Sequence, residues 1–222
     1  MYVPRRGIVV LDKDGTMRNS EPGYEDEFAG ILEARYDIPR EEARIFFRET
    51  CGMPTSERFS IILARYGKPL DDLGRLCSTY AERGYREIAP LFPDVIPCLE
   101  ELKRRDYRLI VSSNMPQQEL DRRIAASDLD CYFEGWLGTS PSVPHKRGHK
   151  EYIRRRFRIS EEHFRQHSSL IGDSPLDMDI AREWGSKGVF IRRPHYQGNA
   201  TADVILASLT ELPGVLDRIF SQ

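Results

Sequence analysis

Residues 7–16 read Gly-Ile-Val-Val-Leu-Asp-Lys-Asp-Gly-Thr, an apolar run followed at once by two carboxylates and a glycine. The unbroken run from Ile8 to Leu11 is typical of a strand buried on both faces. Asp12 and Asp14 then lie at its carboxyl end, where open α/β sheets bind ligands. Because side chains alternate along a strand, we expect the two carboxylates to share one side and Lys13 to point away. Two acids this close repel each other unless a cation or a shared proton relieves them.

The same residues also fit a solvated turn, since Asp and Gly are common turn residues. The totals describe an ordinary globular protein of 222 residues, with 40% apolar and 31% charged residues. A formal net charge of -2 does not indicate a nucleic-acid partner. Since no apolar run approaches the length of a membrane span, we expect no membrane association.

The four cysteines, Cys51, Cys77, Cys98 and Cys131, are far apart and lack metal-ligand spacing. We expect reduced thiols in a reducing compartment. The first residues run directly into the expected strand and leave no room for a signal peptide, so the prediction is a cytoplasmic protein.

Helical periodicity dominates from Glu25 to about Glu87 and predicts four successive helices. Turn signals at residues 37–39, 51–54 and 67–69 separate them. The apolar positions that define them are Phe28, Ile31, Leu32 and Tyr36; Ala43, Phe46 and Phe47; Phe59, Ile62, Leu63 and Tyr66; and Leu73, Leu76, Cys77 and Tyr80. This pattern predicts a helical block inserted behind the first strand.

Strands and helices alternate after Leu91, which indicates parallel crossovers and a doubly wound sheet. The expected strands cover residues 107–113, 132–137, 168–172, 188–192 and 202–206. The expected helices cover residues 95–105, 117–127, 151–157 and 175–184. The fold class is therefore α/β, with a Rossmann-like core and a small helical insertion.

Two further strand ends carry polar side chains. Ser112, Ser113 and Asn114 end one strand, although Ser at such a place is most often a helix cap. The other end reads Gly-Asp-Ser-Pro-Leu-Asp over residues 172–177, where Asp173 and Asp177 are one helical turn apart and Pro175 fits the first helical position. For Asp173 the alternative role is capping this helix.

Carboxylates from these strand ends predict a divalent cation, because Asp12, Asp14, Asp173 and Asp177 would otherwise repel one another. An all-oxygen site suits Mg²⁺. A phosphate approaching such a site also needs a protein cation nearby. Lys146 and Lys150, between the third and fourth strands, are the candidates.

In these features the chain resembles the haloacid dehalogenase-like hydrolase superfamily. The matching motifs are Asp12-Lys-Asp14-Gly15-Thr16, Ser113-Asn114, Lys146 and Gly172-Asp173-Ser-Pro-Leu-Asp177. The helical block resembles the small cap of its phosphoglycolate phosphatase-like and β-phosphoglucomutase-like branch. The resemblance implies a core of residues 1–16 and 88–222 and a cap of residues 17–87.

The resemblance also implies residue roles. Asp12 would attack phosphorus to give an aspartyl-phosphate, and Asp14 would serve as general acid and base with a pKa raised by its crowded neighbours. Mg²⁺ would be held by Asp12, Asp173 and the main-chain carbonyl of Asp14. Asp177 would support the metal or Lys146. Ser113 and Lys146 would stabilise the phosphoryl oxygens. Gly15, Thr16 and Asn114 would bind phosphate or substrate.

The match is incomplete at two places. Arg147 follows Lys146 where many relatives have proline, so Lys150 stays an alternative, and Ser112 stays an alternative to Ser113. Asn19 and Ser20 stand where many relatives have an acidic residue.

In the cap, Arg48 and Arg58 could bind a carboxylate or second phosphate of the substrate, although a cap arginine is more often solvated surface. Tyr24 and Glu25 also stay open.

The expected activity is hydrolysis of a small phosphorylated metabolite, resembling phosphoglycolate or a sugar phosphate, by a Mg²⁺-dependent monomer or homodimer. A phosphomutase of the same branch is the nearest alternative. A non-catalytic protein that binds a phosphorylated ligand or a partner is the alternative from a different class. Dehalogenase chemistry would leave Asp14 unexplained.

Overall fold

The structure, a computed structural model, describes residues 6–84, 86, 88–196 and 200–221. Glu87, where the expected cap ends, lies outside this set. In the described residues a parallel sheet of six strands has the order β3-β2-β1-β4-β5-β6. Its strands are β1 (Gly7–Leu11), β2 (Tyr107–Pro116), β3 (Gly135–Thr139), β4 (Ser168–Gly172), β5 (Lys187–Ile191) and β6 (Val204–Leu206).

Strand β1 lies at the centre of the sheet and pairs with β2 and β4. All its residues are buried, as its unbroken apolar run predicts. Val9 and Leu11 join one hydrophobic cluster, while Ile8 and Val10 join another on the opposite face. The strand order reverses between β1 and β4, so the carboxyl ends of β1, β2 and β4 meet at a topological switch point.

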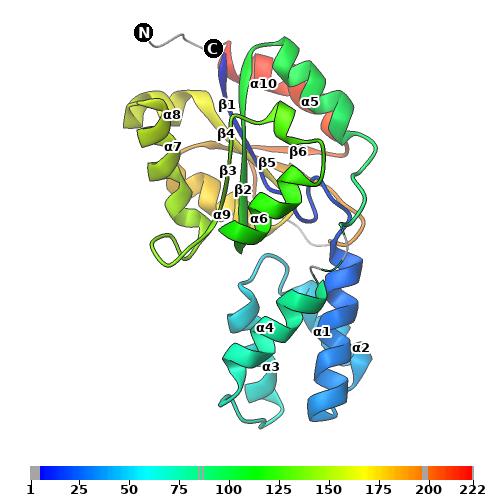
Figure 1. The fold of residues 1–222 in the computed structure, drawn as a ribbon. Helices are drawn as coiled ribbons and strands as arrows, with labels where there is room; N and C mark the ends of the chain where they lie inside the picture. Colours follow the sequence, from blue (N-terminus) through cyan, green and yellow to red (C-terminus); the bar gives the residue numbers. More distant parts are fainter. Residues whose placement is uncertain (1–5, 85, 87, 197–199, 222) are drawn as a thin grey trace.

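Helices cover both faces of the sheet and give three layers (Figure 1). One face packs against α5 (Val95–Arg104), α6 (Gln117–Ala125) and α10 (Leu212–Phe220). The other packs against α7 (His149–Phe157), α8 (Glu161–His167) and α9 (Pro175–Trp184). The α/β class with a doubly wound parallel sheet is thereby confirmed.

Four helices follow β1 and form a separate bundle below the carboxyl edge of the sheet in Figure 1, which we call the cap. They are α1 (Glu21–Tyr36), α2 (Arg40–Glu49), α3 (Thr55–Arg65) and α4 (Leu73–Gly84). Phe28 lies at the centre of an aromatic cluster, with its ring centroid 4.7 Å from that of Phe59 and 5.5 Å from that of Phe47. The cap therefore has its own hydrophobic core.

The two connections between cap and core run side by side. Asn19 N–H donates to the Pro90 carbonyl at 2.9 Å, and Phe92 N–H donates to the Met17 carbonyl at 3.0 Å. The buried Arg18 side chain donates to the Ala89 carbonyl at 2.6 Å. This pairing fixes where the cap leaves and rejoins the core.

Several expected boundaries shift in the structure. The strand expected at 132–137 begins only at Gly135, because Asp130–Tyr132 form a 3-10 turn. The first cap helix begins at Glu21 rather than Glu25, with Pro22 in its first turn. The expected elements at 168–172 and 175–184 have the observed bounds, whereas α8 and α10 were not expected.

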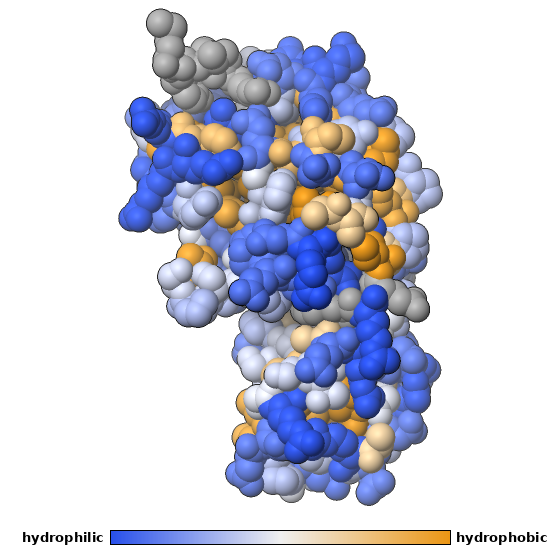
Figure 2. Space-filling view, in the orientation of Figure 1, coloured by the Kyte–Doolittle hydropathy of each residue, from blue (hydrophilic) through white to orange (hydrophobic). Residues whose placement is uncertain are grey.

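The face in Figure 2 is mostly hydrophilic, with hydrophobic residues showing through in separate patches. Large exposed apolar side chains are scattered over cap and core, among them Ile45, Leu70 and Ile205. None of the helices in the described part of the chain is long and apolar enough to span a membrane. The described cysteines are all free thiols, as expected.

Arg193, just after β5, ties three segments together at the edge of the sheet. Its guanidinium donates to the Thr16 carbonyl at 2.8 and 3.1 Å and to both carboxylate oxygens of Asp94 at 3.0 Å. Its side chain is only 6% exposed. A planar fork is needed for this pattern, and a lysine cannot reproduce it.

We therefore expect Arg193→Lys to lower the free energy of unfolding by about 2–4 kcal/mol, since it leaves buried acceptors unpaired. Urea unfolding measures this change. The control is Arg182→Lys, which alters an exposed pair with Asp179 and should change stability by less than about 0.5 kcal/mol. Equal losses in both variants would contradict the role of Arg193.

Candidate active site

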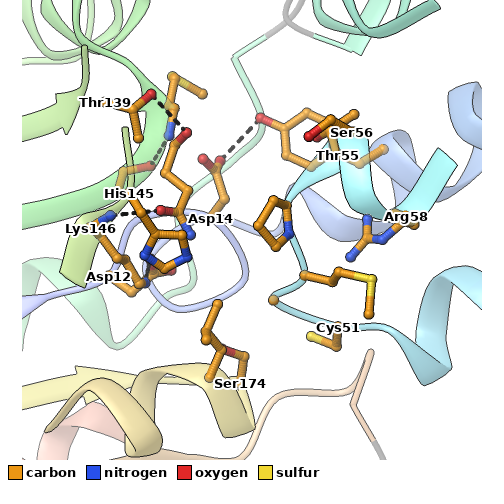
Figure 3. A pocket seen from close by; sticks show the side chains of 18 of the residues that line it. Asp12, Asp14, Cys51, Thr55, Ser56, Arg58, Thr139, His145, Lys146 and Ser174 are labelled. Carbon is orange, nitrogen blue, oxygen red and sulfur yellow. Dashed lines mark hydrogen bonds and ion pairs between the residues drawn. The ribbon is translucent and has the colours of Figure 1, made fainter. Parts of the chain in front are cut away.

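A cavity of about 380 Å³ lies between the carboxyl edge of the sheet and the cap. In Figure 3, Asp12, His145 and Lys146 approach it from the core, and Cys51 and Arg58 approach it from the cap. The sequence-predicted residues that line it are Asp12, Asp14, Arg58, Ser113, Asn114, Lys146, Asp173 and Asp177. The three strand ends thus meet at one mouth, as their polar side chains predicted.

Lys146 is the cation nearest Asp12. Its Nζ lies 2.7 Å from Oδ1 of Asp12 and also contacts the Asp177 carboxylate. The side chain is 3% exposed and is delivered by a 3-10 turn of residues Lys146–Gly148. Lys150 lies elsewhere and pairs with Glu161 at 2.5 Å. Of the two candidate lysines, Lys146 and not Lys150 therefore lies beside Asp12.

Burial and charge shift the pKa values of this pair. Burial raises the pKa of Asp12, and the negative charges of Asp177 and Asp173 raise it further, although Lys146 opposes them. Burial lowers the pKa of Lys146, but Asp12 and Asp177 outweigh it, so the pKa is raised. Lys146 therefore stays charged, and one ammonium does not fully offset the carboxylates around it.

Asp173 follows β4 and is held from two sides. The Thr16 hydroxyl contacts its Oδ1, and Nε2 of His195 lies 2.7 Å from its Oδ2. Gly15 has φ +81°, and a Cβ there would lie 2.4 Å from Oδ2 of Asp173. Gly15 is thus needed for close approach of the carboxylate. Thr16 is fully buried, so its hydroxyl orients Asp173 instead of reaching the cavity.

Ser174, and not Asp173, caps helix α9. The Ser174 hydroxyl accepts from Asp177 N–H at 3.3 Å, and the Asp177 carboxylate accepts from Ser174 N–H at 3.2 Å. This reciprocal capping box fixes Asp177 as the third residue of the helix. The capping alternative for Asp173 is wrong, which leaves its carboxylate available to the cavity.

Ser113 and Asn114 lie at the end of β2. Ser113 lines the cavity and its hydroxyl accepts from Met115 N–H at 3.1 Å. The Asn114 side chain accepts from Lys146 N–H at 3.0 Å and so positions the lysine backbone. Ser112 is fully buried on the other side of the strand, with its hydroxyl 2.8 Å from Nδ1 of His149. The structure therefore brings Ser113 to the cavity and not Ser112.

Lys13 does not point away from the carboxylates. Its side chain is 2% exposed and its Nζ lies 2.7 Å from Oδ1 of Asp14. Tyr24 of the cap donates to the same oxygen at 3.2 Å. Burial raises the pKa of Asp14, but the Lys13 charge and hydrogen bond outweigh it, so the pKa is lowered. The expectation of a raised Asp14 pKa is wrong because it assumed only acidic neighbours.

The two cap arginines have different places. Arg58 lines the cavity, with its guanidinium carbon 4.0 Å from the Phe47 ring centroid and Nη2 donating to the Thr50 carbonyl at 2.8 Å. Arg48 is exposed and pairs with Glu25 at 2.8 Å, and neither is among the described residues that line the cavity. The expectation that Arg48 contacts substrate is therefore not supported by its position.

Sequence reasoning missed Glu21 and His195. Glu21 lines the cavity at the start of α1, directly after Asn19 and Ser20, which stand where an acidic residue was expected. His195 follows β5 and reaches Asp173 only because β5 lies beside β4. The signal that the sequence offered was its position three residues beyond the strand expected at 188–192.

The donor set fits a hard divalent cation. Asp12, Asp173 and Asp177 each offer a carboxylate oxygen within 4.8 Å of the others, and all three side chains are buried. Oxygen-only ligands are those that Mg²⁺ prefers. Burial is the main cause of the raised Asp12 pKa, and a cation bound beside this carboxylate would oppose it.

The chain is similar to proteins that are named as phosphatases. One of them is a phosphorylated carbohydrates phosphatase of Thermotoga maritima, which is 26% identical over 128 residues. The matched region covers 57% of this chain and 58% of that protein. A phosphoglycolate phosphatase of Rhodobacter capsulatus is 27% identical over 183 residues, 80% of each protein. The fold is shared with a haloacid dehalogenase-like protein of Streptococcus pneumoniae, with a TM-score of 0.77, 23% identity and coverage of 94% and 97%.

The family model for haloacid dehalogenase-like hydrolases matches residues 7–185. This range begins with β1 and ends directly after α9, so it includes the strand ends that carry Asp12, Ser113 and Asp173. The chain therefore belongs to the haloacid dehalogenase-like hydrolases.

Proposed function

We propose that this protein is a Mg²⁺-dependent phosphatase that hydrolyses a small phosphorylated metabolite through an aspartyl-phosphate on Asp12. The observation that carries the proposal is the meeting of Asp12, Asp14, Lys146 and Asp173 in one cavity under the cap. Two relatives carry phosphatase names, one for phosphorylated carbohydrates and one for phosphoglycolate. Residues 17–87 would serve as a cap over the substrate.

Asp12 is the proposed nucleophile. Lys146 Nζ, 2.7 Å from Oδ1, holds this carboxylate in place and leaves the other oxygen free to attack phosphorus. Ser113 and Lys146 would stabilise the equatorial oxygens of the phosphoryl group as charge spreads over them. Asp177 also contacts the Lys146 ammonium and so acts as a positioning residue.

Asp14 is the proposed general acid and base. Its lowered pKa keeps it ionised before substrate binds, which suits removal of a proton from the hydrolytic water. A dianionic phosphate arriving beside it raises its pKa and favours the protonated form needed to protonate the leaving oxygen. The Tyr24 hydroxyl, 3.2 Å away, ties this group to the cap.

Asp12 and Asp173, with the main-chain carbonyl of Asp14, are the groups that would hold Mg²⁺. The bound ion would offset the negative charge of the phosphoryl group and of the carboxylates around it. Thr16 and His195 orient Asp173 for this purpose.

Glu21 favours a substrate with hydroxyl groups over one with a carboxylate. It lines the cavity, and its carboxyl oxygens can accept hydrogen bonds from hydroxyls whether or not the group is ionised. When it is ionised, it also repels a carboxylate of the substrate. Arg58 is already engaged with the Thr50 carbonyl and the Phe47 ring. We therefore place sugar phosphates ahead of phosphoglycolate.

The first test replaces the nucleophile. Asp12→Asn should lower kcat by on the order of 10⁴-fold or more, since an amide cannot attack phosphorus. Phosphate release is measured over a panel of sugar phosphates and phosphoglycolate. Asp179→Asn, at an exposed position of α9, is the control and should keep wild-type rates. Undiminished turnover in Asp12→Asn, or no turnover of any substrate by the wild type, would refute the proposal.

The second test removes the cation. Dialysis against a chelator should abolish phosphate release, and Mg²⁺ should restore it, because the buried carboxylates otherwise repel the phosphate dianion. Wild-type rates in the chelator would show that Lys146 alone compensates their charge. Thermal unfolding in the same buffers checks that the protein stays folded.

The third test follows Glu21 through pH in metal-free protein. A carboxyl whose pKa rises from 4.5 to about 7 on folding favours the folded state fully below pH 4.5 and loses this contribution as pH rises to 7. Glu21→Gln should therefore match the wild type at low pH and be more stable above pH 7, by about 1–3 kcal/mol.

Urea unfolding at a series of pH values measures this difference. Glu27→Gln, on the same helix but not among the residues lining the cavity, is the matched control. The same pH dependence in both variants would show that the effect does not come from the cavity.

A further inference from the structure

A second group of potential metal ligands lies beside the proposed magnesium site. Cys51 from the cap, Asp173 after β4 and His195 after β5 each offer one ligand atom, all within 4.8 Å of one another. Asp173 has a part in the proposed phosphatase reaction, and His195 orients it. Cys51 has no part in that reaction and needs a separate explanation.

His195 presents a ring nitrogen to Asp173. Its side chain is 10% exposed, and Nε2 lies 2.7 Å from Oδ2 of Asp173. A cation that replaces the hydrogen of this contact would be held by Nε2 and Oδ2 together. The Cys51 thiolate would then be its third ligand.

The cap loop that carries Cys51 is built against the core. Gly52 has φ +83°, and a Cβ there would lie 2.8 Å from the Ser174 hydroxyl oxygen. The Thr50 carbonyl on the other side of Cys51 accepts from Arg58 at 2.8 Å. The thiol is thus delivered to Asp173 by a loop fixed on both sides.

We propose that Cys51, Asp173 and His195 bind Zn²⁺ and that this ion ties the cap loop to the core. Sulfur, nitrogen and oxygen together are zinc ligands, whereas Mg²⁺ takes oxygen ligands. A tetrahedral Zn²⁺ with bonds of about 2.0–2.3 Å places its ligands about 3.3–3.6 Å apart. The ligand atoms of the cluster lie within 4.8 Å of one another, so small side-chain rotations bring them to this separation.

The site predicts inhibition by zinc. Because Asp173 belongs to both sites, Zn²⁺ there removes a ligand from Mg²⁺. Because one ligand comes from the cap and two from the core, the ion also opposes cap opening, which substrate entry and product release require. Zinc binding itself does not depend on the phosphatase proposal and can be measured without substrate.

The experiment uses Co²⁺ as a spectroscopic substitute for Zn²⁺ on the purified full chain, after treatment with a chelator. A thiolate-to-cobalt charge-transfer band should appear and saturate at one equivalent, and Zn²⁺ should displace it. The band should be absent in Cys51→Ser. His195→Gln should lower the Co²⁺ affinity by at least about tenfold, the scale on which even outer-shell partners of a metal act.

Cys77→Ser is the matched control, because Cys77 lines the same cavity but is not part of the cluster. It should keep the band. No band in the wild type, a band unchanged in Cys51→Ser, a band lost in Cys77→Ser, or unchanged affinity in His195→Gln would each overturn the site. Far-ultraviolet circular dichroism confirms that each variant is folded.

A second measurement tests inhibition in the Mg²⁺-loaded enzyme. Zn²⁺ should inhibit the wild type and Cys77→Ser at the same concentration, whereas Cys51→Ser should need at least about ten times more. Equal zinc sensitivity in all three proteins would place inhibition at the carboxylates alone and overturn the bridging role of Cys51. If no substrate is turned over, the cobalt spectra still decide the site.

Discussion

The contact of the Lys146 ammonium with Asp12 and Asp177 is the constraint on which the site depends. Parallel strands with apolar faces bring several acids to one buried edge, where each carboxylate loses solvation. The Lys146 ammonium contacts two of them, Asp12 and Asp177, and its charge stabilises their buried carboxylates. Without the lysine, both carboxylates would be buried without a positive partner. The residual negative charge is what makes the edge suited to a divalent cation.

The cap adds a second constraint, since it must cover this edge without becoming part of the core. Its aromatic cluster around Phe28 supplies an independent hydrophobic core, and two paired connections attach it to the sheet. Moving such a unit exposes neither core. The contacts that cross to the sheet are few and polar or close-packed, such as Tyr24 with Asp14 and Gly52 with Ser174. Cap residues can therefore contribute to the cavity while remaining separable from it.

Two basic side chains, Lys13 and His195, give this chain features that its acidic motifs do not suggest. Lys13 returns to Asp14 and lowers its pKa, so the acid nearest the cap is held ionised at rest. His195 lies against Asp173, and that carboxylate outweighs the effect of burial and raises the histidine pKa. Asp14, Asp173 and Asp12 thus each contact a different basic side chain. These different partners give similar carboxylates different chemical properties.

The sheet, the helical insertion and the strand ends could be predicted from the sequence, because apolar runs and helical periodicity are local patterns that burial enforces. The meeting of Asp12, Ser113 and Asp173 was predictable too, since the carboxyl ends of parallel strands share an edge. Three placements come from tertiary contacts instead: Lys146 rather than Lys150 lies beside Asp12, Arg48 lies outside the cavity, and His195 reaches Asp173. Those contacts join loops distant in sequence, and side-chain direction in a loop depends on packing that no local pattern encodes.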